Sequence, residues 1–474
     1  MKIKDKLLLY GAGRRADTIL SLLDSEQTDN IILVDSNHVM WGGKKYGVTI
    51  TGPEVIKDYY NWCITIADKA IRDEIENKCI VEFGLDKDKE ISYVELIISL
   101  FDHFELGETN KRGKELSILI DCIGGLPLGG IESWSLLLAE HFIKTGKVCE
   151  IISRYGEYDI PGKLCDKIIY IKPGNNKYSK ETINSIVEKI RDRMPCAVIC
   201  NRIDECLLAA CLLKEKFPKD IRVYSVTHID QDIQIEGKRD FWNYYDIDAE
   251  IGVSKDICCR LIDYGIPKEH VYLMTCPVNV ETDLKRQYSM EKDSPIRIGY
   301  AGRMDGYKGS QKRMDLIVGL AKELTKRNIS YVLELAGDGP IRGEMENDLM
   351  LLIQEGSVLF VGRLSDTEVN NFWKSKDIAV NLSDYEGHSI SQMEAMACGA
   401  VPILTDVSGV KDDVTDGING FIVPAGEYVE AADKVEYLAK NRRLLPKMGY
   451  AAHEEIAGKA SWTIHMGFWE EMLS

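Results

Sequence analysis

The chain has 474 residues, a 45% hydrophobic share and a formal net charge of −17 at pH 7. A chain of this length is expected to form about three domains, and the apolar share is ample for several cores. The negative charge argues against nucleic acid as the main partner, although a local basic site can still hold a small anion.

The sequence favours a cytoplasmic protein. Its apolar runs fall short of the ~20 residues that a membrane helix needs. The first apolar segment, within "MKIKDKLLLYGAGRR", is too short for a signal peptide. The 13 cysteines are spread singly through apolar stretches, which is typical of buried thiols in a reducing compartment.

The first block, residues 1–110, begins with a glycine turn between two expected strands. "KLLLYG" and "IILVDS" are strand-like, with a helix expected over 15–23 between them. Gly11 and Gly13 follow the first strand at dinucleotide-fingerprint spacing, and Asp35 ends the next one. We expect a nucleotide or nucleotide-sugar module of the Rossmann-like type. A structural relic is the second interpretation and an active dehydrogenase the third, because no domain for hydride chemistry accompanies the module.

Two further blocks, residues 113–290 and 295–474, alternate strand-like runs with amphipathic segments. Such alternation predicts α/β domains with parallel sheets covered on both faces. Ligands in such folds bind beyond the carboxyl ends of strands, so the loops after strands are the candidate sites. The expected strands are "LSILIDC", "VCEIISR", "KIIYI", "CAVICN", "RVYSVTH" and "AEIGVS" in one block, and "IRIGYAG", "YVLELAG", "VLFVG", "IAVNLS", "VPILTD" and "GFIV" in the other.

The first candidate loops are glycine-rich or basic. In "IGGLPLGGIES", Gly129 and Gly130 precede a helix expected near residue 131, where free N–H groups can face an anion. After "IRIGYAG", Gly302 and Arg303 are followed by Lys308 at an expected helix start. Cations beside a helix N-terminus oppose the macrodipole unless an anion sits there, which favours a diphosphate site over two solvated side chains.

The last loops carry glycines and carboxylates. "LELAGDGP", with Gly337 and Gly339, either lines a ligand or merely turns the chain. "YEGHSISQMEAMACGAVPI" holds Glu386 in a loop and Glu394 in the helix that follows. Ser391 to Glu394 fits a capping box, so Glu394 has a structural explanation, whereas Glu386 has none. The amides of 389–391 could cradle a phosphate or a sugar.

Residues 115–474 resemble the retaining glycosyltransferases of family 4, which have the GT-B fold. The motifs that carry the resemblance are "GGIE", "VTH", "GVSK", "GRMDGYKG", "LAGDGP" and the paired-glutamate stretch. The resemblance implies two facing Rossmann-like domains, preceded here by the smaller module. The last helix, about 460–474, is expected to pack back on the middle domain. The smaller module is similar to those of enzymes of bacterial surface polysaccharides.

The resemblance also assigns roles to the loops. Glu394 should bind the ribose, and Glu386 the sugar with the amides that follow it. Arg303 and Lys308 match the cations that neutralise the leaving diphosphate, and His228 matches the histidine at the catalytic centre. The further residues expected to bind the donor are Gly129, Gly130, Gly302, Gly337, Gly339, Gly387, His388, Ser389, Ile390 and Ser391.

The sequence departs from the family pattern at two places. "TCPVNVETD" lacks the family's asparagine–glycine pair, which concerns local loop geometry, and His388 stands where many relatives carry Phe. Asp246 and Asp248 form an Asp-x-Asp pair, as in metal sites of the other major glycosyltransferase fold. They precede a strand, so we expect a turn or a helix end there and no metal.

The predicted activity is transfer of a hexose-type sugar from a nucleoside-diphosphate sugar to a glycan or lipid-linked acceptor, with no added cofactor. Synthesis of bacterial cell-surface polysaccharide is the expected context, with peripheral membrane contact as a further expectation. Two alternatives remain open: an inactive transferase-like sensor of nucleotide sugars and a sugar-nucleotide epimerase of the same fold. The nucleotide, the sugar and the acceptor are not specified by the sequence.

Overall fold

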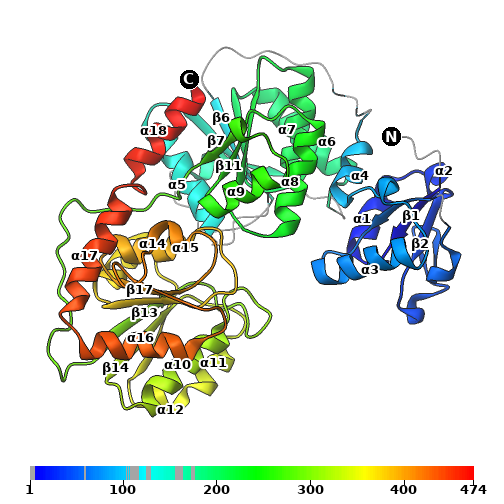
Figure 1. Cartoon of the computed structure of the whole chain (residues 1–474). Coiled ribbons are helices and arrows are strands. Elements are labelled where there is room, and N and C mark those ends of the chain that lie inside the picture. The colour runs from blue at the N-terminus through cyan, green and yellow to red at the C-terminus, as the bar shows by residue number, and fades with distance from the viewer. Residues whose placement is uncertain are drawn as a thin grey trace. The chain divides into compact units, whose positions relative to one another are not determined.

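The computed structural model describes residues 6–57, 60–102, 104, 106, 117–123, 130–154, 164–171 and 177–474. The chain folds into two compact units. The first holds Met1–Thr227, Gln231–Ile251 and Arg260–Tyr272, and the second holds His228–Asp230, Gly252–Cys259 and Leu273–Ser474. Figure 1 shows the helices and strands of both. None of the described helices is both long and apolar enough to cross a bilayer.

The N-terminal part of the first unit is built on a five-stranded sheet of order β3-β4-β2-β1-β5. Its strands are β1 (Leu7–Tyr10), β2 (Ile31–Val34), β3 (Lys44–Lys45), β4 (Val48–Thr51) and β5 (Asn61–Ile64). The helices are α1 (Arg14–Leu22), α2 (Ser25–Thr28), α3 (Lys69–Val81) and α4 (Tyr93–Ser99). Only β3 is antiparallel to its neighbour. The two strands and the helix expected around the glycine turn are therefore confirmed as β1, β2 and α1.

The same unit contains a seven-stranded sheet of order β12-β11-β10-β9-β6-β7-β8. Its strands are β6 (Ser117–Cys122), β7 (Val148–Arg154), β8 (Ile168–Ile171), β9 (Ala197–Cys200), β10 (Arg222–Thr227), β11 (Ala249–Gly252) and β12 (Val271–Leu273). Its helices are α5 (Gly130–Lys144), α6 (Lys180–Arg193), α7 (Glu205–Lys216), α8 (Asp232–Tyr244) and α9 (Lys255–Asp263). All six runs expected as strands in this block are strands, and β12 is an additional one.

The two sheets of the first unit share one apolar core. Buried residues of β1, α4, β6 and α7 belong to a single cluster, and α4 packs along α8. Arg72 of α3 forms a bidentate ion pair with Glu236 of α8, with N···O distances of 2.6 and 2.8 Å. The Ser92 hydroxyl, which caps α4, also donates a hydrogen bond to Asp240 of α8. An ion pair from α3 and a hydrogen bond from the N-cap of α4 therefore join the N-terminal module to α8.

The second unit is built on a six-stranded sheet of order β15-β14-β13-β16-β17-β18, with every neighbouring pair parallel. Its strands are β13 (Ile296–Ala301), β14 (Tyr331–Ala336), β15 (Val358–Gly362), β16 (Ile378–Asn381), β17 (Val401–Thr405) and β18 (Phe421–Val423). Its helices are α10 (Met314–Lys326), α11 (Arg342–Asp348), α12 (Met350–Gln354), α13 (Asp366–Lys374), α14 (Ile390–Ala397), α15 (Val410–Asp413), α16 (Tyr428–Lys440), α17 (Leu444–Ala457) and α18 (Trp462–Leu473). Figure 1 shows α10 and α16 on one side of the sheet and α14 on the other.

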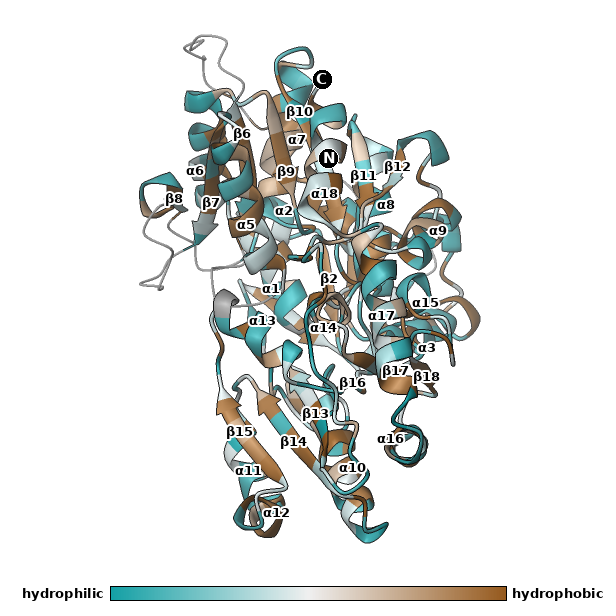
Figure 2. Cartoon of the chain, turned by 90° about the vertical axis from the view of Figure 1, so that its left-hand side faces the viewer, coloured by the Kyte–Doolittle hydropathy of each residue, from teal (hydrophilic) through white to brown (hydrophobic). Residues whose placement is uncertain are grey.

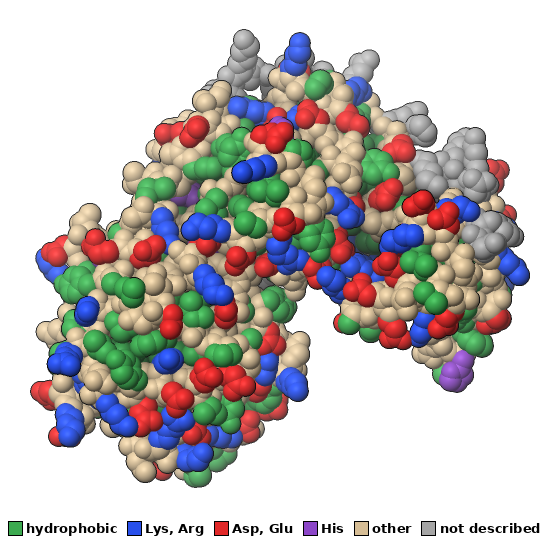
Figure 3. Space-filling view, in the orientation of Figure 1, with side chains coloured by type: hydrophobic (Ala, Val, Ile, Leu, Met, Phe, Trp, Pro, Cys, Tyr) green, Lys and Arg blue, Asp and Glu red, His purple; other side chains and the backbone are tan. Residues whose placement is uncertain are grey.

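Two sequence patterns explain this layering. The five residues of β17 are all buried, as expected for a central parallel strand covered on both faces, and the strands are correspondingly apolar in Figure 2. In α10, the buried residues Met314, Ile317, Ala321 and Leu324 recur at helical spacing and face the sheet. On the face shown in Figure 3, Lys and Arg side chains are interspersed with Asp and Glu.

Candidate active site

Three loops meet at the carboxyl ends of the adjacent strands β14, β13 and β16. The amide of Gly302, after β13, donates to the Ala336 carbonyl of β14 over 3.0 Å, and the amide of Met304 donates to Asp338 over 3.0 Å. Gly337 has a φ of +125°, and a Cβ there would lie 1.9 Å from the Gly302 carbonyl oxygen. Only glycine allows the first two loops to approach this closely. Gly339 is equally constrained, because its Cβ would lie 2.1 Å from the Met304 carbonyl oxygen.

The loop between β13 and α10 is longer than the sequence suggested. The expected helix start at Lys308 is wrong, because α10 begins at Met314. Gly309 has a φ of +92° within a turn closed by Ser310 and Tyr307, which breaks any helix there. Lys308 is an exposed residue of that turn. The macrodipole argument for a diphosphate at Lys308 therefore does not hold.

Arg303 is connected to the third loop through Gln311. The Arg303 side chain is 56% exposed, and its Nη2 donates to Gln311 Oε1 over 2.8 Å. Gln311 Nε2 in turn donates to the Tyr385 carbonyl over 3.1 Å. The guanidinium thus stands at the carboxyl end of β13 with most of its surface open to solvent.

Glu386 is a buried carboxylate with a lysine partner that the sequence analysis missed. Lys312 Nζ lies 2.5 Å from Glu386 Oε1, and the two side chains are 14% and 9% exposed. Asn381 Nδ2 adds a hydrogen bond of 3.2 Å. Burial by itself would raise the pKa of Glu386, but the Lys312 charge outweighs it and the pKa is lowered. The apolar pattern of α10 begins at Met314, two residues after Lys312. This pattern was the signal that could have placed Lys312 in the loop before the helix.

The capping box predicted for Ser391 and Glu394 is wrong. The helix α14 has Ser389 as its N-cap, which makes no side-chain capping bond among the described residues. Ser391 Oγ donates instead to the Ala301 carbonyl of β13 over 2.7 Å, so this hydroxyl fastens the helix to the central strand. Glu394 is half-buried in the second turn of α14. Gly399, at φ +75°, ends the helix as expected.

The Gly387 backbone lies close to His228, which follows β10. A Cβ on Gly387 would lie 1.7 Å from the His228 carbonyl oxygen, so only glycine fits at this place. His228 is half-buried. The neighbouring His388 turns its ring toward Val253 and Asp413, so both of its ring nitrogens face protein oxygens.

The N-terminal glycine turn is tied down by the chain itself. The Ala12 amide donates to Asp35 Oδ2 over 2.7 Å, and the Asn37 amide donates to Asp35 Oδ1 over 2.8 Å. A Cβ on Gly11, which has a φ of +106°, would lie 2.8 Å from the Ile66 side chain, whereas Gly13 has open space around it. Each carboxylate oxygen of Asp35 can still accept a second hydrogen bond.

The remaining predicted positions divide into two groups. Gly129 lies outside the described residues, and Gly130 is the first residue of α5. Asp246 and Asp248 both contact Lys214, at 3.2 and 2.7 Å, and Asp248 also accepts a hydrogen bond from the Val223 amide. This aspartate pair therefore braces the start of β11.

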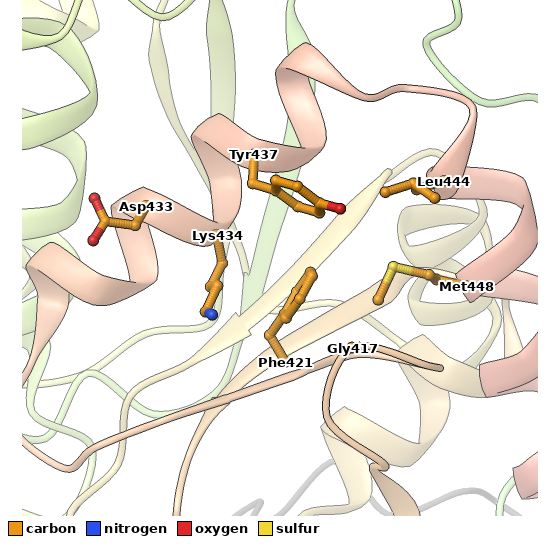
Figure 4. A pocket seen from close by; sticks show the side chains of 7 residues that line it. All are labelled: Gly417, Phe421, Asp433, Lys434, Tyr437, Leu444 and Met448. Atoms are coloured by element: carbon orange, nitrogen blue, oxygen red, sulfur yellow. The ribbon is translucent and has the colours of Figure 1, made fainter.

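A separate hollow of about 310 Å³ lies in the second unit, away from these loops (Figure 4). Its lining residues are Gly417, Phe421, Asp433, Lys434, Tyr437, Leu444 and Met448. Phe421 and Tyr437 meet edge to face, and Lys434 Nζ lies 5.1 Å from the centre of the Phe421 ring. None of the predicted site residues belongs to this lining. Among the described residues, no three His, Cys, Asp or Glu side chains gather as a metal-binding group.

Two regions of the chain match known protein families. Residues 281–455 match the family described as Glycosyl transferases group 1. Residues 3–91 match the family described as C2185-like, N-terminal. The first region includes all three loops of the candidate site, and the second includes the glycine turn.

Each curated relative matches only a part of this chain. N-acetyl-alpha-D-glucosaminyl L-malate synthase of Bacillus anthracis is 28% identical over 175 residues, which is 37% of this chain and 44% of that protein. The capsular polysaccharide biosynthesis glycosyltransferase CapM of Staphylococcus aureus is 27% identical over 192 residues, or 40% and 48% of the two chains. The chain thus spans about half the length of the curated relatives it matches.

Solved structures extend the likeness to more of the fold. Alr3699/HepE of Anabaena, solved in complex with UDP and glucose, matches with a TM-score of 0.61 at 14% identity. The match covers 76% of this chain and 99% of that one. At this identity the likeness concerns the fold alone, and it confirms the GT-B fold class predicted from the sequence.

Proposed function

We propose, from the group 1 glycosyl transferase domain at residues 281–455, that the chain is a retaining glycosyltransferase. It moves a hexose-type sugar from a nucleoside-diphosphate sugar to a glycan or lipid-linked acceptor. One of the relatives named above is a capsular polysaccharide biosynthesis glycosyltransferase, which supports synthesis of cell-surface polysaccharide as the context. The reaction takes place in the cytoplasm, at the inner face of the membrane where the acceptor is lipid-linked.

The observation that carries the proposal is the buried Glu386 carboxylate beside Lys312 at the carboxyl ends of the central strands. A buried ion pair is costly to build, and its remaining lone pairs can accept hydrogen bonds from sugar hydroxyls. The amides of 387–391 lie next to it at the start of α14, where backbone N–H groups are free of helical partners. The loop therefore offers acceptors and donors side by side, as a sugar requires.

The charge of the leaving group explains the exposed cations. Cleavage of the anomeric bond leaves negative charge on the diphosphate, and Arg303 and Lys308 are the cations that neutralise it in this proposal. Both are exposed on the loop after β13, so both can turn onto a bound donor. Cations held near the diphosphate stabilise the transition state more than the ground state. Glu394 binds the ribose, and His228 lies at the reacting centre because its backbone adjoins Gly387.

The other residues have supporting roles. Gly302, Gly337 and Gly339 allow the backbone to approach the donor. In this proposal the chain has three domains, at residues 1–110, 113–290 and 295–474.

The N-terminal module holds a nucleotide or nucleotide sugar at Gly11 and Gly13, with Asp35 fixing the turn.

A donor-hydrolysis assay tests the proposal. The full chain is incubated with a panel of nucleotide sugars, and the products are separated by chromatography. Release of free sugar and nucleoside diphosphate, lost in Glu386→Gln and kept in the exposed-surface control Lys322→Gln, is the expected result. Conversion to an epimeric donor would establish the epimerase instead. A donor-dependent rise in melting temperature without any product would establish the sensor.

A further inference from the structure

His388 is a buried histidine next to Glu386, with a hydrogen-bond acceptor at each ring nitrogen. The residue is 7% exposed. Its Nδ1 lies 2.8 Å from the Val253 carbonyl oxygen, and its Nε2 lies 2.5 Å from Asp413 Oδ2. In the ion pair with Asp413 the two side chains are 1% and 0% exposed. Solvent therefore reaches neither nitrogen.

These two partners fix the protonation of the ring. A carbonyl oxygen and a carboxylate oxygen only accept, so each ring nitrogen must carry a proton. A proton on Asp413 would be the alternative, but Lys459 Nζ lies 2.9 Å from Asp413 Oδ1 and favours the ionised carboxylate. Burial would lower the pKa of His388, but the Asp413 charge outweighs it and raises that pKa. Burial would raise the pKa of Asp413, but the His388 and Lys459 charges outweigh it and lower that pKa.

The charged and titratable groups around this pair come from several segments. Lys459 also bonds to the Asp412 carbonyl and to Glu455, and Lys255 Nζ lies 3.7 Å from Asp412. Asp412, Lys459 and Cys276 lie close enough to act on the pair itself. Glu455 lies beside Lys459, and Lys255 lies beside Asp412. The pair thus sits among both signs of charge, with Lys459 on the far side of Asp413.

The ring joins the Glu386 loop to two other parts of the second unit. Val253 belongs to the segment 252–259, and Asp413 ends α15. A Cβ on Gly409 would lie 2.5 Å from the Gly387 carbonyl oxygen, and one on Gly387 would lie 1.7 Å from the His228 carbonyl oxygen. The loop is therefore packed tightly at Gly387 and held by charge one residue later.

We propose that the His388 imidazolium is a positioning residue, which clamps the loop so that Glu386 and the following amides keep their place beside His228. The inference rests on the proposed transferase function, because it is the donor loop that is positioned. His388 does not touch the sugar in this proposal. It acts through the loop, and the protonated ring is the active form.

Two variants separate the arms of the clamp. In His388→Gln the side-chain amide reaches toward Asp413, and in His388→Asn it reaches toward Val253, so each keeps one hydrogen bond. Both should lower kcat/KM for the nucleotide sugar that turns over by about 10- to 100-fold, the scale of a lost charged hydrogen bond or a displaced reacting group.

The pH profile gives the second readout. Because the folded-state pKa is raised, the clamp is complete at low pH and is lost as pH rises through that pKa. Wild-type kcat/KM should therefore fall on the alkaline side, and that fall should vanish in both variants. Unchanged kcat/KM and an unchanged profile in the variants would overturn the positioning role.

A measurement without turnover keeps the two proposals distinguishable. Nitrogen NMR of the full chain labelled at histidine should show one ring with both nitrogens protonated, assigned among the 8 histidines by its loss in His388→Gln. A ring with one unprotonated nitrogen at neutral pH would overturn the clamp. If no nucleotide sugar turns over, the transferase proposal fails, and the clamp is tested by melting temperature instead. The melting temperature of the wild type should then fall relative to that of His388→Gln as pH rises. Melting temperatures that change in parallel with pH would overturn the clamp.

Discussion

Replacing Lys312 with methionine removes the cation beside Glu386 while keeping most of the side-chain volume. The two charged atoms lie 2.5 Å apart, and the side chains are 14% and 9% exposed. Removing one partner of a buried pair leaves an uncompensated charge and costs about 3–5 kcal/mol. Asn381 still donates to Glu386, and Lys312 is partly exposed, so we expect the lower end, about 3 kcal/mol.

The pH dependence has a definite sign. The lowered pKa of Glu386 means that the pair stabilises the fold above the carboxyl's unfolded-state pKa and is lost as pH falls through the folded-state value. In Lys312→Met, burial is left to raise the pKa of Glu386. The cost of the mutation should therefore be greatest at neutral pH and shrink in acid, where the carboxyl takes up a proton.

Urea unfolding of the full chain, followed by fluorescence at several pH values, measures this. Lys308→Met is the matched control, because this exposed lysine of the same loop should change stability by less than about 0.5 kcal/mol. The double variant Lys312→Met with Glu386→Gln should regain part of the loss, since no charge is left buried. Equal effects at 312 and 308, or no recovery in the double variant, would refute the reasoning.

The remaining predictions concern activity. Arg303→Ala should lower turnover by roughly 10²-fold with an unchanged melting temperature, and near-normal rates would remove Arg303 from the diphosphate site. Glu394→Gln should weaken binding of the nucleotide sugar in calorimetry while stability holds; loss of stability with full affinity would make the carboxylate structural. EDTA should leave initial rates unchanged, and restoration of a lost rate by Mn²⁺ would contradict a charge balance built on side chains alone. Asp246→Asn should match wild type in the same rate assay, because its carboxylate is 83% exposed beside Lys214.

Local patterns in the sequence were enough for most of the secondary structure. Continuous apolar runs such as "VPILT" predict strands buried on both faces, and β17 is such a strand. Gly399 predicts the end of α14, because its φ of +75° suits a residue without a Cβ. The paired-glutamate stretch likewise lies in the loop and helix expected for it. Each of these features depends on neighbours within a few residues.

The start of α10 and the capping of α14 were predicted incorrectly, although both are local features. At Lys308 the charge pattern points to a helix start, whereas the apolar periodicity of the helix begins only at Met314. At Ser391 the hydroxyl bonds across the sheet to Ala301, 90 residues away, so a tertiary contact replaced the local one. A capping motif competes with any acceptor that packing brings near.

The partners of the site residues were decided by the tertiary structure alone. Lys312 and Glu386 are 74 positions apart, and His388 and Asp413 are 25 apart. No periodicity in the sequence links two charged residues at such separations. Each side chain, considered by itself, is expected to be a solvated surface residue. The sequence by itself determined which strands, turns and motif the chain has. Packing of parallel strands decided which charges became buried together, because it brings their carboxyl ends to one edge of the sheet.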